Sequence, residues 1–123
     1  MDELLFVYGT LHPERAPREI AEVARRLRLV GVGWVRGRRF ELGPYPGVVL
    51  DESSRAEGAV FALPDDAETL AMLDAYEDYR ADDPVGSLFR RVETLATLQD
   101  GSELRCWVYV YNWPLPVHVQ LPR

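Results

Sequence analysis

The order of apolar and polar positions predicts a strand followed by a helix in the first part of the chain. Residues 4–8 are continuously apolar and end at Gly9, a pattern typical of a strand buried on both faces. Between residues 20 and 27, apolar side chains recur at three- and four-residue spacing and charged side chains lie between them, which predicts an amphipathic helix. Gly31 is the expected end of this helix.

The middle of the chain has the pattern of several short strands. Residues 30–35, 39–42, 48–50 and 59–63 are rich in apolar and β-branched side chains. Glycine, proline and polar residues separate these segments and predict turns between them. We therefore expect a set of short, turn-linked strands here.

A second helix is predicted after Pro64. Asp65 is placed to accept hydrogen bonds from the free amides of the first turn, and Glu68 three residues later completes a capping-box pattern. Leu70 and Leu73 supply the apolar stripe of this helix.

The last third of the chain predicts a β-hairpin. Residues 89–99 and 102–111 flank Asp100-Gly101, a dipeptide suited to the positive φ angles of a two-residue turn. A register that runs straight from this turn places Arg90 opposite Tyr111, whereas a bulge would shift the pairing. Together with two separated helices, these strands predict an α+β fold with a mainly antiparallel, curved sheet.

Length and composition are those of a globular protein. The chain has 123 residues, of which 47% are hydrophobic and 28% charged, so we expect a single domain over residues 1–123. No apolar run approaches the roughly 20 residues needed to cross a membrane, so no membrane association is expected. The acidic start shows no secretory signal, and we expect a cytoplasmic protein.

Charge and cysteine content exclude some classes of function. The net charge of -6 disfavours binding to a phosphate backbone, so no nucleic-acid partner is expected. Cys106 is the single cysteine and the two histidines are far apart, which excludes an intramolecular disulfide and argues against a zinc site. We therefore expect no metal.

Glu77 is the strongest candidate for chemistry. It lies four residues after Leu73 and so continues the apolar stripe of the second predicted helix. Burial of a carboxylate raises its pKa, and such a group can accept a proton in one step and return it in the next. The alternative is that the helix has already ended at Tyr76, which leaves Glu77 as a solvated charge.

Other candidate positions are less distinctive. Gly9 lets the backbone approach a ligand, and successive loop amides can bind a carboxylate or oxyanion, although a glycine after a strand is commonly a simple turn. Arg91 lies in a predicted strand, where it either binds a carboxylate or faces water. Tyr109 and Tyr111 either belong to the core or present their hydroxyls to a cavity.

The chain resembles the γ-glutamylcyclotransferase-like family, especially its γ-glutamylamine cyclotransferase branch. The matching stretches occur in the family's order and cover the chain from Phe6 to Asn112. They are Phe6-Val7-Tyr8-Gly9-Thr10-Leu11, Leu42-Gly43-Pro44-Tyr45-Pro46-Gly47, Glu57-Gly58-Ala59-Val60-Phe61, Leu73-Asp74-Ala75-Tyr76-Glu77, Phe89-Arg90-Arg91-Val92 and Trp107-Val108-Tyr109-Val110-Tyr111-Asn112.

This resemblance implies a small mixed, mainly antiparallel β-barrel flanked by two helices, with one pocket and no cofactor. It implies that the α-amino group of a γ-glutamyl amine or peptide attacks its own side-chain carbonyl and releases 5-oxoproline and a free amine. The family's catalytic glutamate falls on Glu77. The expected substrate-binding residues are Tyr8, Gly9, Thr10, Leu11, Tyr45, Arg91 and Tyr111.

Two positions depart from the family pattern. Asp78 stands where glycine is common, which is expected either to raise the pKa of Glu77 further or to reflect a different leaving group. Ala59 stands where an acidic residue is frequent. The alternative function is a non-catalytic module that binds an acidic, amino-acid-like ligand in the same pocket. In either case we expect a small-molecule ligand and a monomer or weak homodimer.

Overall fold

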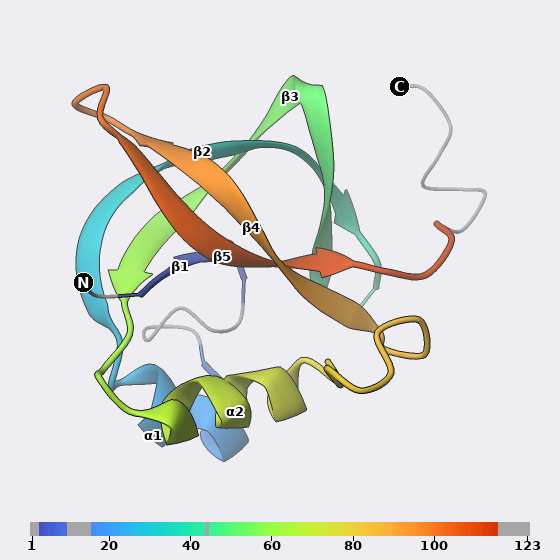
Figure 1. The fold of residues 1–123 in the computed structure, drawn as a ribbon. Coiled ribbons are helices and arrows are strands. Elements are labelled where there is room, and N and C mark those ends of the chain that lie inside the picture. Colours follow the sequence, from blue (N-terminus) through green and yellow to red (C-terminus); the bar gives the residue numbers. More distant parts are fainter. Residues whose placement is uncertain (1–2, 10–15, 44, 116–123) are drawn as a thin grey trace.

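The fold is a closed five-stranded β-barrel with two helices against one side (Figure 1). The structure is a computed structural model that describes residues 3–9, 16–43 and 45–115. The strands follow the order β1-β3-β2-β4-β5 around the barrel, with β1 parallel to β5 and the other recorded pairs antiparallel. This confirms the predicted α+β fold with a mixed barrel. The elements are β1 (Leu4–Val7), α1 (Arg18–Ala24), β2 (Arg28–Glu41), β3 (Pro46–Ala62), α2 (Ala67–Tyr76), β4 (Phe89–Leu98) and β5 (Glu103–Tyr111).

The middle of the chain forms two long strands, so the prediction of several short ones was wrong. β2 and β3 pair along nearly their whole length, with register shifts between Leu29 and Gly31 and between Arg36 and Gly37. These glycines mark bulges, at which a strand bends and continues. Gly31 therefore lies within β2, and helix α1 has already ended at Ala24.

Helix α2 begins one residue later than predicted. Asp66, rather than Asp65, is the N-cap, and its carboxylate accepts a 2.7 Å hydrogen bond from the Thr69 amide. Asp66 has the extended backbone that an N-cap residue adopts.

The predicted hairpin is present, with a register one residue away from the expected one. Phe89 lies opposite Tyr111, and Arg91 lies opposite Tyr109. The amide of Leu98 donates to the Ser102 carbonyl at 2.9 Å, and residues 99–101 form the loop. Gly101 has a φ of 89°, as expected for a three-residue hairpin loop that ends in a left-handed residue. The two-residue turn, with Arg90 opposite Tyr111, was therefore wrong.

Two clusters of buried side chains lie on opposite faces of the strands. Along β1, Leu5 and Val7 pack with the residues of the helices, whereas Phe6 packs with side chains from the other four strands. This confirms the prediction of a strand buried on both faces. The helix-side cluster contains Leu5, Val7, Ile20, Val23, Leu27, Ala59, Phe61, Leu63, Leu73, Phe89 and Tyr109. The barrel-interior cluster contains Phe6, Tyr8, Val35, Val48, Ala56, Val60, Ala96, Cys106 and Val108.

Among the described residues, neither helix has the length and apolar character required for a membrane span.

Candidate active site

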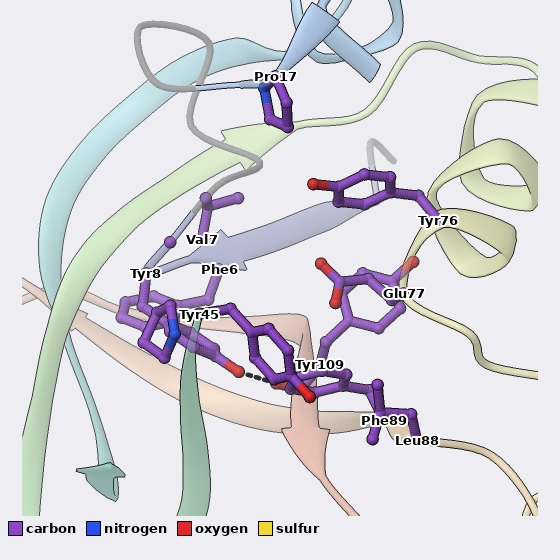
Figure 2. A pocket seen from close by; sticks show the side chains of 12 residues that line it. Phe6, Val7, Tyr8, Pro17, Tyr45, Tyr76, Glu77, Leu88, Phe89 and Tyr109 are labelled. Atoms are coloured by element: carbon purple, nitrogen blue, oxygen red, sulfur yellow. Dashed lines mark hydrogen bonds between the residues drawn. The ribbon is translucent and has the colours of Figure 1, made fainter. Parts of the chain in front are cut away.

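A cavity of about 290 Å³ opens on the helix side of the barrel (Figure 2). It brings together the end of β1, the turn between β2 and β3, the end of α2, the start of β4 and strand β5. The described residues that line it are Phe6, Val7, Tyr8, Gly9, Pro17, Tyr45, Pro46, Tyr76, Glu77, Leu88, Phe89 and Tyr109.

Glu77 is the only charged side chain among these lining residues. It caps the C-terminus of α2, and its amide donates to the Leu73 carbonyl at 3.0 Å. Helix α2 thus ends at Tyr76, as the alternative interpretation of the sequence predicted. That interpretation also expected Glu77 to be a solvated charge, whereas its carboxylate lines the cavity. Burial raises the pKa of Glu77 to about 7. Near neutral pH this group can both accept and donate a proton.

The backbone after Glu77 has the geometry of a Schellman motif. The amide of Asp78 donates to the Ala75 carbonyl at 3.1 Å, and the amide of Tyr79 donates to the Asp74 carbonyl at 2.8 Å. Asp78 occupies the left-handed position of this motif with a φ of 55°. Its side chain is 55% exposed and lies 3.9 Å from Nε of Arg80. The cause of the raised Glu77 pKa is burial rather than the charge of Asp78.

Tyr8 and Gly9 line the same cavity as Glu77, although the sequence separates them widely. The Tyr8 hydroxyl donates to the Tyr109 carbonyl at 2.5 Å and accepts from the Val48 amide at 3.3 Å. Arg39 donates to the Tyr8 carbonyl at 2.6 Å, so both ends of Tyr8 are fixed by the protein. A Cβ atom at Gly9 would lie 3.1 Å from Pro46, so glycine preserves space at this wall. Thr10 and Leu11 lie outside the described residues.

The remaining predicted site residues occupy different positions. Tyr45 lines the cavity, and its ring lies 5.8 Å from that of Phe89. The Tyr111 ring also lies 5.8 Å from that of Phe89, and Tyr111 is not among the described lining residues. Arg91 is likewise absent from that wall, and its guanidinium is paired with Asp74.

Sequence reasoning did not single out Asp74. Its carboxylate accepts from Arg91 at 2.8 and 3.2 Å and from the Tyr109 hydroxyl at 2.6 Å. The available signal was helical spacing, because Asp74 precedes Glu77 by three residues and lies on a neighbouring face. The opposing β-strand positions of Arg91 and Tyr109 were obscured by the expected hairpin register.

The residues of the cavity can support proton transfer next to the backbone at Gly9. Glu77 supplies one group with a pKa near neutrality, and the surrounding wall is mainly aromatic and aliphatic. Within the described parts of the chain, His, Cys, Asp and Glu side chains form no group of three or more suited to a metal ion.

Comparison with known proteins identifies the family. Residues 5–122 match the family described as "Gamma-glutamyl cyclotransferase, AIG2-like". No curated protein sequence matches significantly.

Solved structures with the same fold have low sequence identity. An AIG2-like protein from Mus musculus has a TM-score of 0.74 and 20% identity, with 98% of this chain and 84% of that chain covered. A solution structure from Arabidopsis thaliana has a TM-score of 0.71 and 22% identity over 95% of this chain and 73% of that chain. A protein described as a gamma-glutamyl cyclotransferase has a TM-score of 0.64 and 16% identity over 90% of this chain and 67% of that chain. The match to the family covers nearly the whole sequence, and the chain belongs to the AIG2-like gamma-glutamyl cyclotransferase family.

Proposed function

We propose that this protein cyclises the γ-glutamyl group of a γ-glutamyl amine to 5-oxoproline and releases the free amine. The observation that carries the proposal is Glu77, a partly buried carboxyl that shares one cavity with the backbone at Gly9. Membership of the gamma-glutamyl cyclotransferase family supports the reaction class.

The reaction needs one proton shuttle. The substrate's α-ammonium transfers a proton to Glu77, and the resulting amine attacks the γ-carbonyl carbon to form the ring C–N bond. The bond between that carbon and the leaving nitrogen then breaks, and the leaving nitrogen receives the proton from Glu77. The ring nitrogen still carries a second proton, which Glu77 also transfers to the released amine, so the products are the neutral lactam and an ammonium. A pKa of about 7 suits both transfers, because the group is neither a very weak base nor a very weak acid near neutral pH.

The loop after β1 is the proposed binding site for the glutamyl head. Backbone amides near Gly9, together with Thr10 and Leu11, would hold its carboxylate and stabilise charge on the attacked carbonyl oxygen. Tyr8 and Tyr45 would contribute the adjacent wall.

The cavity wall favours an amine over an amino acid or peptide as leaving group. Among the described lining residues the only charge is that of Glu77, so a carboxylate on the leaving group would meet no cation there. This observation supports the γ-glutamylamine branch. It also disfavours a simple binder of acidic ligands, because such a module gains nothing from a buried carboxylate in its pocket.

The substitution Glu77→Gln tests the proposal. It preserves the shape of the side chain and removes the proton shuttle, so we expect turnover to fall by about 10³–10⁴-fold, since one group serves both transfers. Substrate affinity should change far less. 5-Oxoproline release from a panel of γ-glutamyl amines and peptides measures the first quantity, and calorimetry measures the second.

Glu68→Gln is the matched control. Glu68 lies on the same helix, is 67% exposed and pairs with Arg26 at 3.7 Å, so its substitution should leave turnover unchanged. Near-normal turnover of Glu77→Gln would exclude Glu77 as the shuttle. Ligand binding by a wild-type protein that turns over none of the panel would favour the binding module.

A further inference from the structure

Asp74 links helix α2 to two strands of the barrel. Its two carboxylate oxygens accept from Nε and Nη2 of Arg91 on β4, at 2.8 and 3.2 Å. One of those oxygens also accepts the hydroxyl of Tyr109 on β5, at 2.6 Å. The side chains of Asp74 and Arg91 are only 18% and 16% exposed, so solvent screens this pair weakly.

Arg91 is held on several sides by the protein itself. Its guanidinium lies 4.3 Å from the ring centre of Trp107 and 5.6 Å from that of Tyr79. A two-pronged ion pair combined with stacking fixes an arginine more tightly than a single contact does. Binding of a substrate carboxylate by Arg91 would require this arrangement to break.

Tyr109 connects the Asp74 pair to the other side of the cavity. Its ring lines the cavity, its hydroxyl binds Asp74, and its carbonyl accepts the hydroxyl of Tyr8. Tyr8 directly precedes Gly9, and Asp74 lies one helical turn before Glu77. Two hydrogen bonds that meet at Tyr109 therefore connect α2, which carries Asp74, to Tyr8 at the end of β1. Figure 2 shows the bond between Tyr8 and Tyr109.

We propose that Asp74 and Arg91 are positioning residues, which act through Tyr109 to fix Glu77 against the backbone at Gly9. The proposal rests on the proposed function and gives Arg91 a role that does not involve contact with substrate. A displacement of about 1 Å at a reacting group costs up to about 10²-fold in rate, so even a small shift of the α2 terminus would be measurable.

The titration of Glu77 reports this positioning independently of catalysis. The titratable groups that line the cavity with it are the phenols of Tyr8, Tyr45, Tyr76 and Tyr109. Among the described residues, the charged groups near these elements include the Asp74–Arg91 pair, the exposed Asp78 beside Arg80, and Arg39 on the Tyr8 carbonyl. If the α2 terminus loosens, water reaches the Glu77 carboxyl and its pKa falls toward 4.5, the ordinary value for glutamate.

The decisive variants are Asp74→Asn and Tyr109→Phe. Asp74→Asn removes the charge that holds Arg91, and Tyr109→Phe removes one hydroxyl while it keeps the ring in the wall. Arg105→Gln is the matched control, because Arg105 forms an exposed ion pair with Glu93 across the same two strands. The measurements are kcat and KM for 5-oxoproline release, and the pKa of the Glu77 carboxyl by carbon-13 NMR, with circular dichroism to confirm folding.

For Asp74→Asn we expect kcat to fall by about 10²-fold while KM changes little. Tyr109→Phe should have a smaller effect in the same direction, and it remains informative where Asp74→Asn does not fold. In both variants the Glu77 pKa should fall, and in Arg105→Gln all values should stay as in the wild type. Unchanged kcat and Glu77 pKa would overturn the proposal, and so would a raised KM with unchanged kcat, which indicates a role in substrate binding rather than in the positioning of Glu77. A wild type inactive on every γ-glutamyl compound contradicts the proposed function alone, because the NMR titration still tests the positioning.

Discussion

The barrel interior and the helix-side cavity each hold one acid, and the two acids respond alike to burial but differ in what they can do. Cys106 lies in the barrel interior, where burial raises its pKa to about 11. Glu77 lies at the cavity on the helix side, where burial raises its pKa to about 7. At neutral pH the thiol is therefore fully protonated and enclosed by apolar side chains, whereas the carboxyl is divided between its two forms beside an open space.

This difference shows that burial alone does not give a side chain a pKa suitable for proton transfer at neutral pH. The ordinary pKa of a carboxyl lies below neutrality, so burial moves it toward the working pH, whereas burial moves a thiol further away. The barrel interior packs side chains from all five strands and shields Cys106. On the helix side, the end of α2 leaves a space that the Glu77 carboxyl can share with a ligand.

The largest expected effect is on pH dependence. A base with a pKa of about 7 loses its proton-accepting form on acidification, so kcat/KM should fall about tenfold for each pH unit well below 7. Stability should change in the opposite sense. The folded state binds this proton more tightly than the unfolded state, so the free energy of unfolding should decrease as pH rises from about 4.5 to about 7.

Each unit of pKa difference corresponds to about 1.4 kcal/mol, so this decrease is at most about 3 kcal/mol. Urea unfolding at a series of pH values measures it, and the pH–rate profile gives the kinetic pKa. Glu77→Gln is the control in the unfolding series and should remove this dependence. Equal slopes in the wild type and in Glu77→Gln would show that Glu77 does not titrate with a raised pKa.

A polar substitution in the barrel interior tests whether the interior and the cavity are independent of each other. Cys106→Ser places a hydroxyl among apolar side chains and should lower the free energy of unfolding by about 1–3 kcal/mol. The cavity is untouched, so kcat of the folded fraction should remain that of the wild type. Cys106→Ala is the control without a new polar group, and denaturant unfolding compares the two. A loss of kcat in folded Cys106→Ser would show that the two clusters are coupled.

The sequence was most informative where one local pattern determines the structure. The apolar run at residues 4–8 predicted that β1 is buried on both faces, and the spacing of Leu70 and Leu73 predicted α2. The order of the family motifs along the chain predicted the barrel and identified Glu77 as the candidate catalytic residue. The alternation of apolar and polar residues did not determine the register, because the hairpin loop has one residue more than expected. Arg91, rather than Val92, therefore lies opposite Tyr109.

The missed features depend on contacts between distant segments. Asp74 acquires its importance from Arg91 and Tyr109, which reach it only after the barrel has closed. Likewise, the glycines of β2 are ambiguous in sequence, because a glycine can end a strand or permit a bulge. At Gly33 a Cβ atom would lie 2.1 Å from the Thr97 carbonyl oxygen, so that glycine allows β2 to approach β4 closely.

The smallest expected effect concerns the residue that follows Glu77. Asp78 adopts a left-handed backbone, φ 55°, which suits glycine better than a residue with a Cβ atom. Asp78→Gly removes the steric cost of the left-handed backbone and removes a negative charge from a helix C-terminus. Glycine loses more backbone entropy on folding, which offsets part of this gain in stability. The exposed contact with Arg80, at 3.9 Å, contributes little. We expect a net gain of about 0.5–1 kcal/mol in the free energy of unfolding.

Asp78→Ala separates the backbone effect from the charge effect. It removes the same carboxylate but keeps a Cβ atom in the left-handed position, so it should be less stable than Asp78→Gly by about 1 kcal/mol. Both variants should keep the pH–rate profile of the wild type, because burial, rather than Asp78, raises the pKa of Glu77. Denaturant unfolding gives the order of stability, and kinetics gives the pKa. If both substitutions lowered the kinetic pKa by the same amount, the charge of Asp78 would act on Glu77, and the pKa of Glu77 would be set by charge as well as by burial.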